Sequence, residues 1–271
     1  DTRQTGASHQ TRTEERAMPA IKQSICFGCF NRGDTTPEQV IAEAAKTGFK
    51  SVEMLSRDHW QTVLDAGLKI AIIGGHGSLR DGLNKPENHD RIEDELNKNI
   101  DIAVEFGIPS LIGFSGDRNG LPDDEGIDIC AEGLKRVTAK AEAKGITICV
   151  ELLNSKVDHP DYQCDKTPWG VEMCKATGSP NVKLLYDIYH MQIMEGDLIR
   201  TIRDNIDYIG HFHTAGNPGR RDMDETQEIY YPPVMQAIAA TDYDGFVGHE
   251  FGPKGDPIEA MHAAYATCQH G

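Results

Sequence analysis

The sequence predicts a (β/α)8 barrel that forms a single α/β domain. Three features of its 271 residues favour this fold: short apolar runs, helical patterns between them, and glycines that end those patterns. A barrel of eight strand–helix units takes about 250 residues, so it suits a chain of this length. Strict alternation favours a closed barrel over a doubly wound open sheet, which normally has fewer strands. The predicted strands cover about residues 22–29, 50–55, 69–74, 109–114, 146–152, 182–187, 207–213 and 245–250.

The apolar runs have the composition of parallel strands. Residues 69–73, for example, read Lys-Ile-Ala-Ile-Ile. Nearly continuous apolar runs of this kind are typical of strands that are covered on both faces. No GxGxxG or phosphate-binding loop follows the first predicted strand, so a nucleotide cofactor has no support.

Helix boundaries are marked by residues that cap helices. Thr36 stands before Pro37 and three residues before Gln39, a capping pattern that starts a helix at the proline. The longest predicted helices cover residues 88–106 and 125–144. Glycine readily takes the left-handed conformation that ends a helix. The predicted helix ends are Gly48, Gly67, Gly107, Gly145 and Gly178.

The composition narrows the class of partner. The formal net charge is -16 and the pI is about 5.0. No basic stripe occurs, and strong acidity argues against binding to nucleic acid or to a membrane surface. No run of about 20 apolar residues occurs, so we expect no transmembrane helix. The acid surplus fits a soluble enzyme and does not indicate which one.

Residues 1–19 are polar and aperiodic, and they are predicted to form a flexible arm before a barrel domain over residues 20–271. The chain begins with Asp1 rather than Met, so two locations stay open. The cytoplasm is favoured, and export after removal of an upstream signal is the alternative.

The seven cysteines are odd in number and irregular in spacing, which argues against a disulfide framework. The pair Cys26 and Cys29 is interpreted as strand packing. A zinc or redox site would need a second pair, or a helix that starts directly behind the first one.

Four predicted strands end on residue types that bind metals: Glu151, Asp187, His213 and Glu250. They are spaced by roughly 30 residues, the length of one strand–helix unit, so we expect them at the C-terminal ends of successive strands. Barrel enzymes keep their chemistry at that rim. Three carboxylates that point at one another need a counter-ion. Three oxygens and one nitrogen suit Mg2+ or Mn2+ best, with Zn2+ or Co2+ as alternatives.

The two glutamates of this set, Glu151 and Glu250, are candidate catalytic residues on different sides of the predicted barrel mouth. One would remove a proton from a carbon next to a carbonyl, and the other would return it at the neighbouring atom. The metal would stabilise the enediolate between the two steps. Period two along a strand puts His211 on the face of His213, one layer deeper, as a core histidine. Glu53 lies within the second predicted strand, and two positions stay open for its side chain: the pocket and the barrel floor.

Three further residues are candidate substrate contacts. His190 lies three residues after Asp187, and helix capping is its alternative role. Arg220 lies in the loop after the seventh predicted strand, where it either clamps a carboxylate or carries an ordinary surface charge. His76 ends the third predicted strand and is expected to line the pocket.

Residues 150–155, 186–196, 211–220, 228–231 and 245–250 carry a resemblance to a known family. Over about residues 20–268 the chain resembles the hydroxypyruvate isomerase family of the xylose-isomerase-like barrels. This family interconverts hydroxypyruvate and tartronate semialdehyde, an aldose–ketose type of isomerisation. The resemblance implies a metal held by Glu151, Asp187, His213 and Glu250, acid–base roles for the two glutamates, and substrate contacts from His190 and Arg220.

One residue departs from this resemblance. Better-known members of the family carry glutamine at the position of His213, and a histidine there is similar to the ketose 3-epimerases. A sugar or inosose isomerase, epimerase or lyase on the same metal centre therefore stays open. So does a non-catalytic sugar-binding barrel, which would bind its ligand without proton exchange. Members of the superfamily often form dimers or tetramers, so a homo-oligomer is also open.

Overall fold

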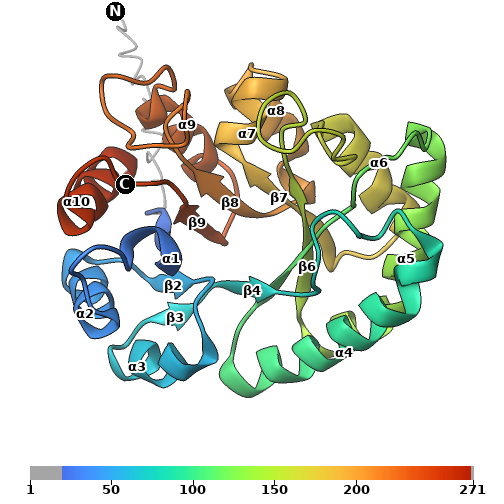
Figure 1. The fold of residues 1–271 in the computed structure, drawn as a ribbon, viewed down its shortest axis with the longest axis horizontal. Helices are drawn as coiled ribbons and strands as arrows, with labels where there is room; N and C mark the ends of the chain where they lie inside the picture. Colours follow the sequence, from blue (N-terminus) through green and yellow to red (C-terminus); the bar gives the residue numbers. More distant parts are fainter. Residues whose placement is uncertain (1–19, 270–271) are drawn as a thin grey trace, which may run out of the picture.

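The strands form one parallel sheet that curves into a nearly closed barrel (Figure 1). The computed structural model describes residues 20–269. Around the sheet the strands follow the order β3-β2-β1-β9-β8-β7-β6-β5-β4. Their bounds are β1 (Lys22–Cys26), β2 (Ser51–Glu53), β3 (Lys69–Ile70), β4 (Ile72–Gly74), β5 (Ser110–Gly113), β6 (Thr147–Leu152), β7 (Val182–Asp187), β8 (Ile209–Thr214) and β9 (Phe246–His249).

The two ends of the sheet are consecutive pieces of the same chain segment. The predicted strand over residues 69–74 divides at Ala71 into β3 and β4. β3 pairs with β2, and β4 pairs with β5. The backbone N–H of Met54, just after β2, donates to the carbonyl of Ile72 in β4 at 3.5 Å. The eight predicted strands therefore account for the whole barrel, and the predicted fold class is confirmed.

Helices surround the barrel, as Figure 1 shows. The two longest predicted helices are confirmed to within two residues at their starts, and they end at the predicted residues. Thr36 caps α2, because its hydroxyl oxygen accepts from the backbone N–H of Gln39 at 3.2 Å. All five glycines predicted to end helices have positive φ. The helices are α1 (Phe27–Phe30), α2 (Pro37–Thr47), α3 (Trp60–Asp65), α4 (His89–Phe106), α5 (Asp123–Lys144), α6 (Thr167–Thr177), α7 (Ile188–Met194), α8 (Leu198–Asn205), α9 (Tyr231–Ala239) and α10 (Pro257–Cys268).

Two predicted boundaries are wrong. The first strand ends at Cys26, and Phe27–Phe30 forms the short helix α1, so Cys29 lies in a helix rather than in strand packing. A helix thus starts directly behind Cys26, although its thiol is not activated, because burial raises the pKa well above its usual range. The predicted strand over 207–213 begins later, because Ile206–Tyr208 forms a 3-10 turn before β8. All seven cysteines are free.

The predicted arm, residues 1–19, lies outside the described residues. Within residues 20–269, no helix is long and apolar enough to cross a membrane.

The barrel interior is apolar on one side, beneath the ends of β6 and β7. Cys149 and Leu185 lie two residues before Glu151 and Asp187, so they share the inward face of their strands. They pack in a small buried cluster of their own, separate from the main core. Side chains of this apolar layer offer no hydrogen bonds to the carboxylates above. Polar partners for the site must therefore come from other strands. The cluster comprises Ile72, Ile112, Cys149 and Leu185.

The rim depends on a close backbone approach at Gly82. A Cβ atom there would lie 2.5 Å from the backbone nitrogen of Gly116 and from the carbonyl oxygen of Phe114. Backbone atoms cannot move aside as a side chain can, so we expect Gly82→Ala to destabilise the fold by about 1–3 kcal/mol. Chemical denaturation would measure the loss. Gly28→Ala is the matched control, because no atom lies within 4 Å of its Cβ position. Equal stability of the two variants would contradict this packing argument.

Candidate metal and catalytic site

The four residues predicted as metal ligands come together at the C-terminal ends of four neighbouring strands. Glu151 lies near the end of β6, Asp187 ends β7, His213 lies near the end of β8, and Glu250 follows β9. One ligand atom from each lies within 4.8 Å of those of the other three. Asp187 and His213 are direct register partners across the β7–β8 pair. The arrangement follows from a parallel sheet, in which equivalent strand ends meet on one rim.

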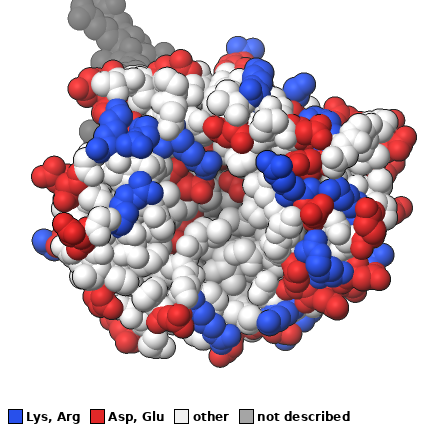
Figure 2. All heavy atoms as spheres, viewed as in Figure 1, with Lys and Arg blue, Asp and Glu red and all other residues white. Residues whose placement is uncertain are grey.

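Figure 2 shows the molecule in the same view as Figure 1, with a hollow near the centre of this face. Acidic atoms are visible inside the hollow, and basic side chains lie along its edge. Glu250 is the most exposed of the four ligand candidates, with 31% of its side chain accessible. The other three are almost fully buried.

The orientation of His213 suits a bound cation. Its Nε2 lies 2.8 Å from Glu53 Oε1, in a hydrogen bond. Its Nδ1 is buried and has no hydrogen-bond partner within residues 20–269, although it lies 2.8 Å from Glu250 Oε2 and 3.6 Å from Glu151 Oε1. Burial lowers the pKa of His213, but the neighbouring Cys26 and Glu250 raise it well above its usual range, so that without a metal the ring carries a proton on Nδ1 as well as on Nε2. A cation bound between Nδ1 and the carboxylate oxygens would take the place of that proton. The donor set therefore fits a divalent metal ion, and three carboxylates favour Mg2+ or Mn2+.

Arg220 is a cationic side chain that contacts two of these carboxylates. Its Nη2 donates to Asp187 Oδ2 at 2.8 Å and to Glu250 Oε2 at 2.5 Å. The loop is held in place by a backbone hydrogen bond from Gly252 to the Arg220 carbonyl at 2.9 Å. Arg220 itself has a φ of 52, in the left-handed region. The guanidinium thus lies within the site rather than on the surface, which was its alternative interpretation.

The two candidate catalytic carboxyls have opposite pKa shifts. Burial raises the pKa of Glu151, and this outweighs the hydrogen bond from His213 that lowers it. Burial also raises the pKa of Glu250, but the positive charges of His213 and Arg220 prevail and hold it at about 2. Two carboxyls with pKa values pushed apart are the usual arrangement for one acid and one base.

His190 is buried in α7, at the start of the helix that follows Asp187. Its Nδ1 lies 2.6 Å from the amide nitrogen of Asn154. The Asn154 side chain is fixed, because its amide also donates to Asp158 and its Oδ1 accepts two backbone N–H groups. The Asn154 amide therefore donates to Nδ1, which puts the imidazole proton on Nε2. Nε2 faces Arg220 Nη1 at 3.0 Å, which is also a donor, so the Nε2 proton has no suitable acceptor there.

His76 holds two loops together. Its Nδ1 lies 2.9 Å from the carbonyl of Gly77, and its Nε2 accepts from the backbone N–H of Phe114 at 2.9 Å. Both ring nitrogens are thus engaged in hydrogen bonds with the backbone. Burial lowers its pKa, which keeps the ring neutral and able to accept. The contacts of His76 are those of a structural residue, and its predicted substrate contact stays a prediction.

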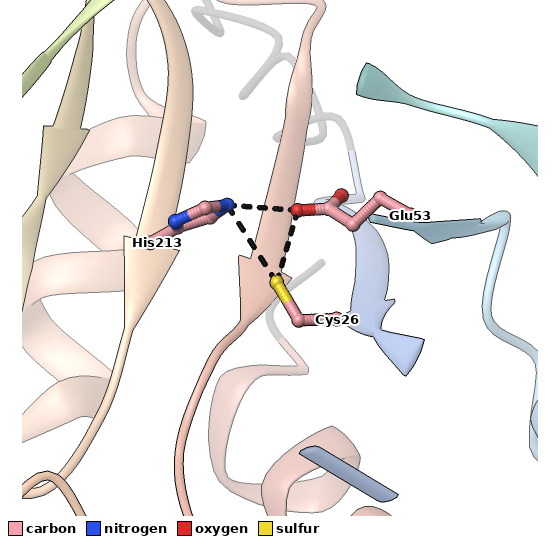
Figure 3. Close-up of side chains that lie close together, drawn as sticks. All are labelled: Cys26, Glu53 and His213. Carbon is pink, nitrogen blue, oxygen red and sulfur yellow. Dashed lines mark hydrogen bonds and ion pairs between the residues drawn. The ribbon is translucent and has the colours of Figure 1, made fainter. Parts of the chain in front are cut away.

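Glu53 and Cys26 lie behind His213, at the ends of β2 and β1 (Figure 3). Glu53 is fully buried, and His211 Nε2 lies 3.1 Å from its Oε1. The expectation that His211 is a hydrogen-bonded core histidine is confirmed. Cys26 Sγ lies 3.4 Å from Glu53 Oε1 and 3.8 Å from His213 Nε2. From the sequence, Cys26 is interpreted as packing, because it lies inside the predicted strand over residues 22–29. The structure ends β1 at Cys26 and thereby places its thiol at the rim.

Comparison with known proteins identifies the family. The family described as "Xylose isomerase-like TIM barrel" matches residues 41–267. A 2-oxo-tetronate isomerase from Pectobacterium atrosepticum is 31% identical over 234 residues, which cover 80% of this chain and 87% of that protein. A hydroxypyruvate isomerase from Escherichia coli is 35% identical over 123 residues, which cover 45% of this chain and 47% of that protein. The chain therefore belongs to the xylose isomerase-like TIM barrel family.

A solved structure supports the same fold. The crystal structure of an AP endonuclease, family 2, from Brucella melitensis superimposes with a TM-score of 0.81, covering 92% of this chain and 100% of that one at 24% identity. The relatives from Pectobacterium atrosepticum and Escherichia coli are both isomerases, so the predicted class, an enzyme that acts as an isomerase, is confirmed.

Proposed function

We propose that this isomerase depends on a divalent metal and interconverts hydroxypyruvate and tartronate semialdehyde. The observation that carries the proposal is the convergence of Glu151, Asp187, His213 and Glu250 beside the partly buried Arg220. A three-carbon 2-oxo acid has two adjacent oxygens for such a site and a carboxylate for Arg220. The relative from Escherichia coli has this activity in its name.

The two glutamates divide the proton transfer. Glu250, ionised, takes a proton from C3 of hydroxypyruvate and leaves an enediolate. Glu151, protonated, delivers a proton to C2, while the hydroxyl proton on O3 moves to O2, so that the aldehyde forms at C3. Glu151, Asp187, His213 and Glu250 would hold a divalent ion, which when bound would supply positive charge to stabilise the enediolate. The pKa directions of the two carboxyls agree with these roles.

Arg220 and His190 are the residues proposed to orient the substrate. Arg220 offers a planar set of donors that suits a carboxylate in two-pronged contact. His190 offers the Nε2 proton, which lacks a suitable protein acceptor. A substrate oxygen near Nε2 would accept a hydrogen bond from it. A buried N–H donor is costly without an acceptor, so this bond would satisfy the buried imidazole.

Proton NMR of the metal-loaded enzyme with hydroxypyruvate in D2O tests this function. We expect deuterium to enter at C3 while tartronate semialdehyde appears. Removal of the metal with a chelator should stop both signals, and added Mn2+ should restore them. Exchange that persists without metal would contradict metal dependence. Ligand binding with no exchange under any condition would point to a sugar-binding barrel instead.

A second substrate is supported by the name of another relative. The 2-oxo-tetronate isomerase from Pectobacterium atrosepticum is 31% identical over 80% of the length of this chain. Hydroxypyruvate and 2-oxo-tetronate are both 2-oxo acids, so the same Arg220 contact serves either substrate. A kcat/KM for 2-oxo-tetronate well above that for hydroxypyruvate would select the longer acid. Turnover of neutral ketoses alone would select a sugar isomerase or epimerase on the same centre.

A further inference from the structure

Glu53 receives hydrogen bonds from two histidines on one strand. His213 Nε2 lies 2.8 Å and His211 Nε2 lies 3.1 Å from the same oxygen, Glu53 Oε1. Glu53 lies on β2 and the histidines on β8, and Figure 3 shows the carboxylate directed across the barrel toward His213. The carboxylate is fully buried, and its second oxygen has no hydrogen-bond partner among the described residues. A buried, ionised carboxyl is costly unless such donors stabilise it.

β9, the strand between β1 and β8, leaves room for the Glu53 carboxylate. It pairs with both of these strands, and its Gly248 is the register partner of His213. A Cβ atom on Gly248 would lie 2.3 Å from Glu53 Oε1. The space that Glu53 occupies is therefore formed by the missing side chain of Gly248. Three strands (β2, β8 and β9) thus determine the hydrogen bond between Glu53 and His213.

We propose that Glu53 is a positioning residue for the metal site, because it fixes His213 in the tautomer with its proton on Nε2 and leaves Nδ1 to ligate. This inference rests on the proposed function, in which His213 is a ligand. A neutral imidazole has one donor and one acceptor nitrogen, and the partner of the first decides which nitrogen can bind a metal. Carboxylates that hold metal-bound histidines in this way typically change metal affinity 10–100-fold when they are lost.

Cys26 contacts the same two side chains but does not replace Glu53. Its sulfur lies farther from both, at 3.4 and 3.8 Å, and a thiol is a weak donor. Burial raises its pKa, so the thiol stays protonated and adds a weak donor to Glu53. Cys26→Ala is therefore the matched control for substitutions at Glu53, because it removes a neighbour of His213 without removing the acceptor.

Two variants of Glu53 separate the loss of its hydrogen-bond acceptor from the loss of its negative charge. Glu53→Met keeps a similar volume and removes the acceptor. Glu53→Gln removes the charge but keeps an oxygen that can face both histidines. The first readout is the tautomer of His213 at saturating Mg2+, from long-range proton–nitrogen NMR of 15N-histidine, assigned with a His213→Gln variant. The second readout is the Kd for Mn2+, from calorimetry.

We expect the Nε2-protonated tautomer in the wild type, in Cys26→Ala and in Glu53→Gln, and its loss in Glu53→Met. The Kd for Mn2+ should rise about 10–100-fold in Glu53→Met, less in Glu53→Gln, and little in Cys26→Ala. An unchanged tautomer and Kd in Glu53→Met would overturn the inference. If Glu53→Met does not fold, an Nδ1-protonated His213 in the wild type would overturn it equally.

The outcomes also separate this inference from the proposed function. Should neither the wild type nor any variant bind Mn2+, metal dependence is wrong, yet a hydrogen-bonded Nε2 proton of His213 that is lost in Glu53→Met still shows that Glu53 orients the ring. A large loss of Mn2+ affinity in Cys26→Ala would make the thiol a ligand and overturn the assignment of Glu53 as the residue that positions His213.

Discussion

Glu250→Gln is expected to abolish deuterium exchange at the substrate carbon and to lower kcat by about 10²–10⁴-fold, the usual contribution of a catalytic acid or base. Glutamine retains an oxygen that can ligate a metal but has no basic site for a proton. Metal binding should therefore be weakened and still measurable by calorimetry. This separation matters because a residue that only binds metal would lose affinity and activity together.

The matched control is Glu172→Gln, because Glu172 carries the same functional group on the exposed surface of α6. It should retain wild-type exchange and metal affinity. Exchange that survives in Glu250→Gln at saturating metal would exclude Glu250 as the base and direct attention to Glu151 for the same step.

Arg220→Ala is expected to raise KM for hydroxypyruvate about 10–100-fold, because a hydrogen bond to a charged group contributes about 1.5–3 kcal/mol. Arg220 also bonds to Asp187 and Glu250, so its loss will disturb the site as well as the substrate contact. A neutral ketose that the wild type turns over serves as the internal reference. The disturbance affects both substrates, whereas the carboxylate contact affects only hydroxypyruvate.

Arg221 offers a control at the adjacent position. Its Nη2 donates to the carbonyl of Pro253, and it bonds to none of the four ligand candidates. Arg221→Ala should leave the ratio of the two KM values unchanged. Equal increases for hydroxypyruvate and the ketose in Arg220→Ala would mean that Arg220 holds no carboxylate and acts only as a counter-ion for Asp187 and Glu250.

The positions of Glu151, Asp187, His213 and Glu250 could be predicted from local pattern alone. Each ends an apolar run, and the runs recur at the spacing of one strand–helix unit. In a parallel barrel that spacing is sufficient to predict that the four side chains lie close together, because the C-terminal ends of all strands meet on one rim. The same regularity explains why His211 could be predicted on the inner face, one layer below His213.

Local pattern does not show the partners that a side chain meets in a distant part of the chain. The substrate contact of His76 stays a prediction, and its Nε2 accepts from the backbone N–H of Phe114, the residue after β5, which nothing near His76 in the sequence indicates. Arg220 was equally compatible with the surface from its spacing. Its direction follows from a loop in which the residue has a positive φ and a backbone hydrogen bond to Gly252.

By itself the sequence determined the barrel and the rim, because periodicity and helix caps are local properties that survive in any parallel arrangement of these segments. Only the tertiary structure decided which residues support that rim. Glu53 and His213 are 160 residues apart, and they meet because closure of the barrel brings β2 and β8 to opposite sides of β1 and β9. The hydrogen bond also requires the bare backbone of Gly248. A contact that depends on two distant strands and on the absence of a side chain in a third has no signature within any one segment.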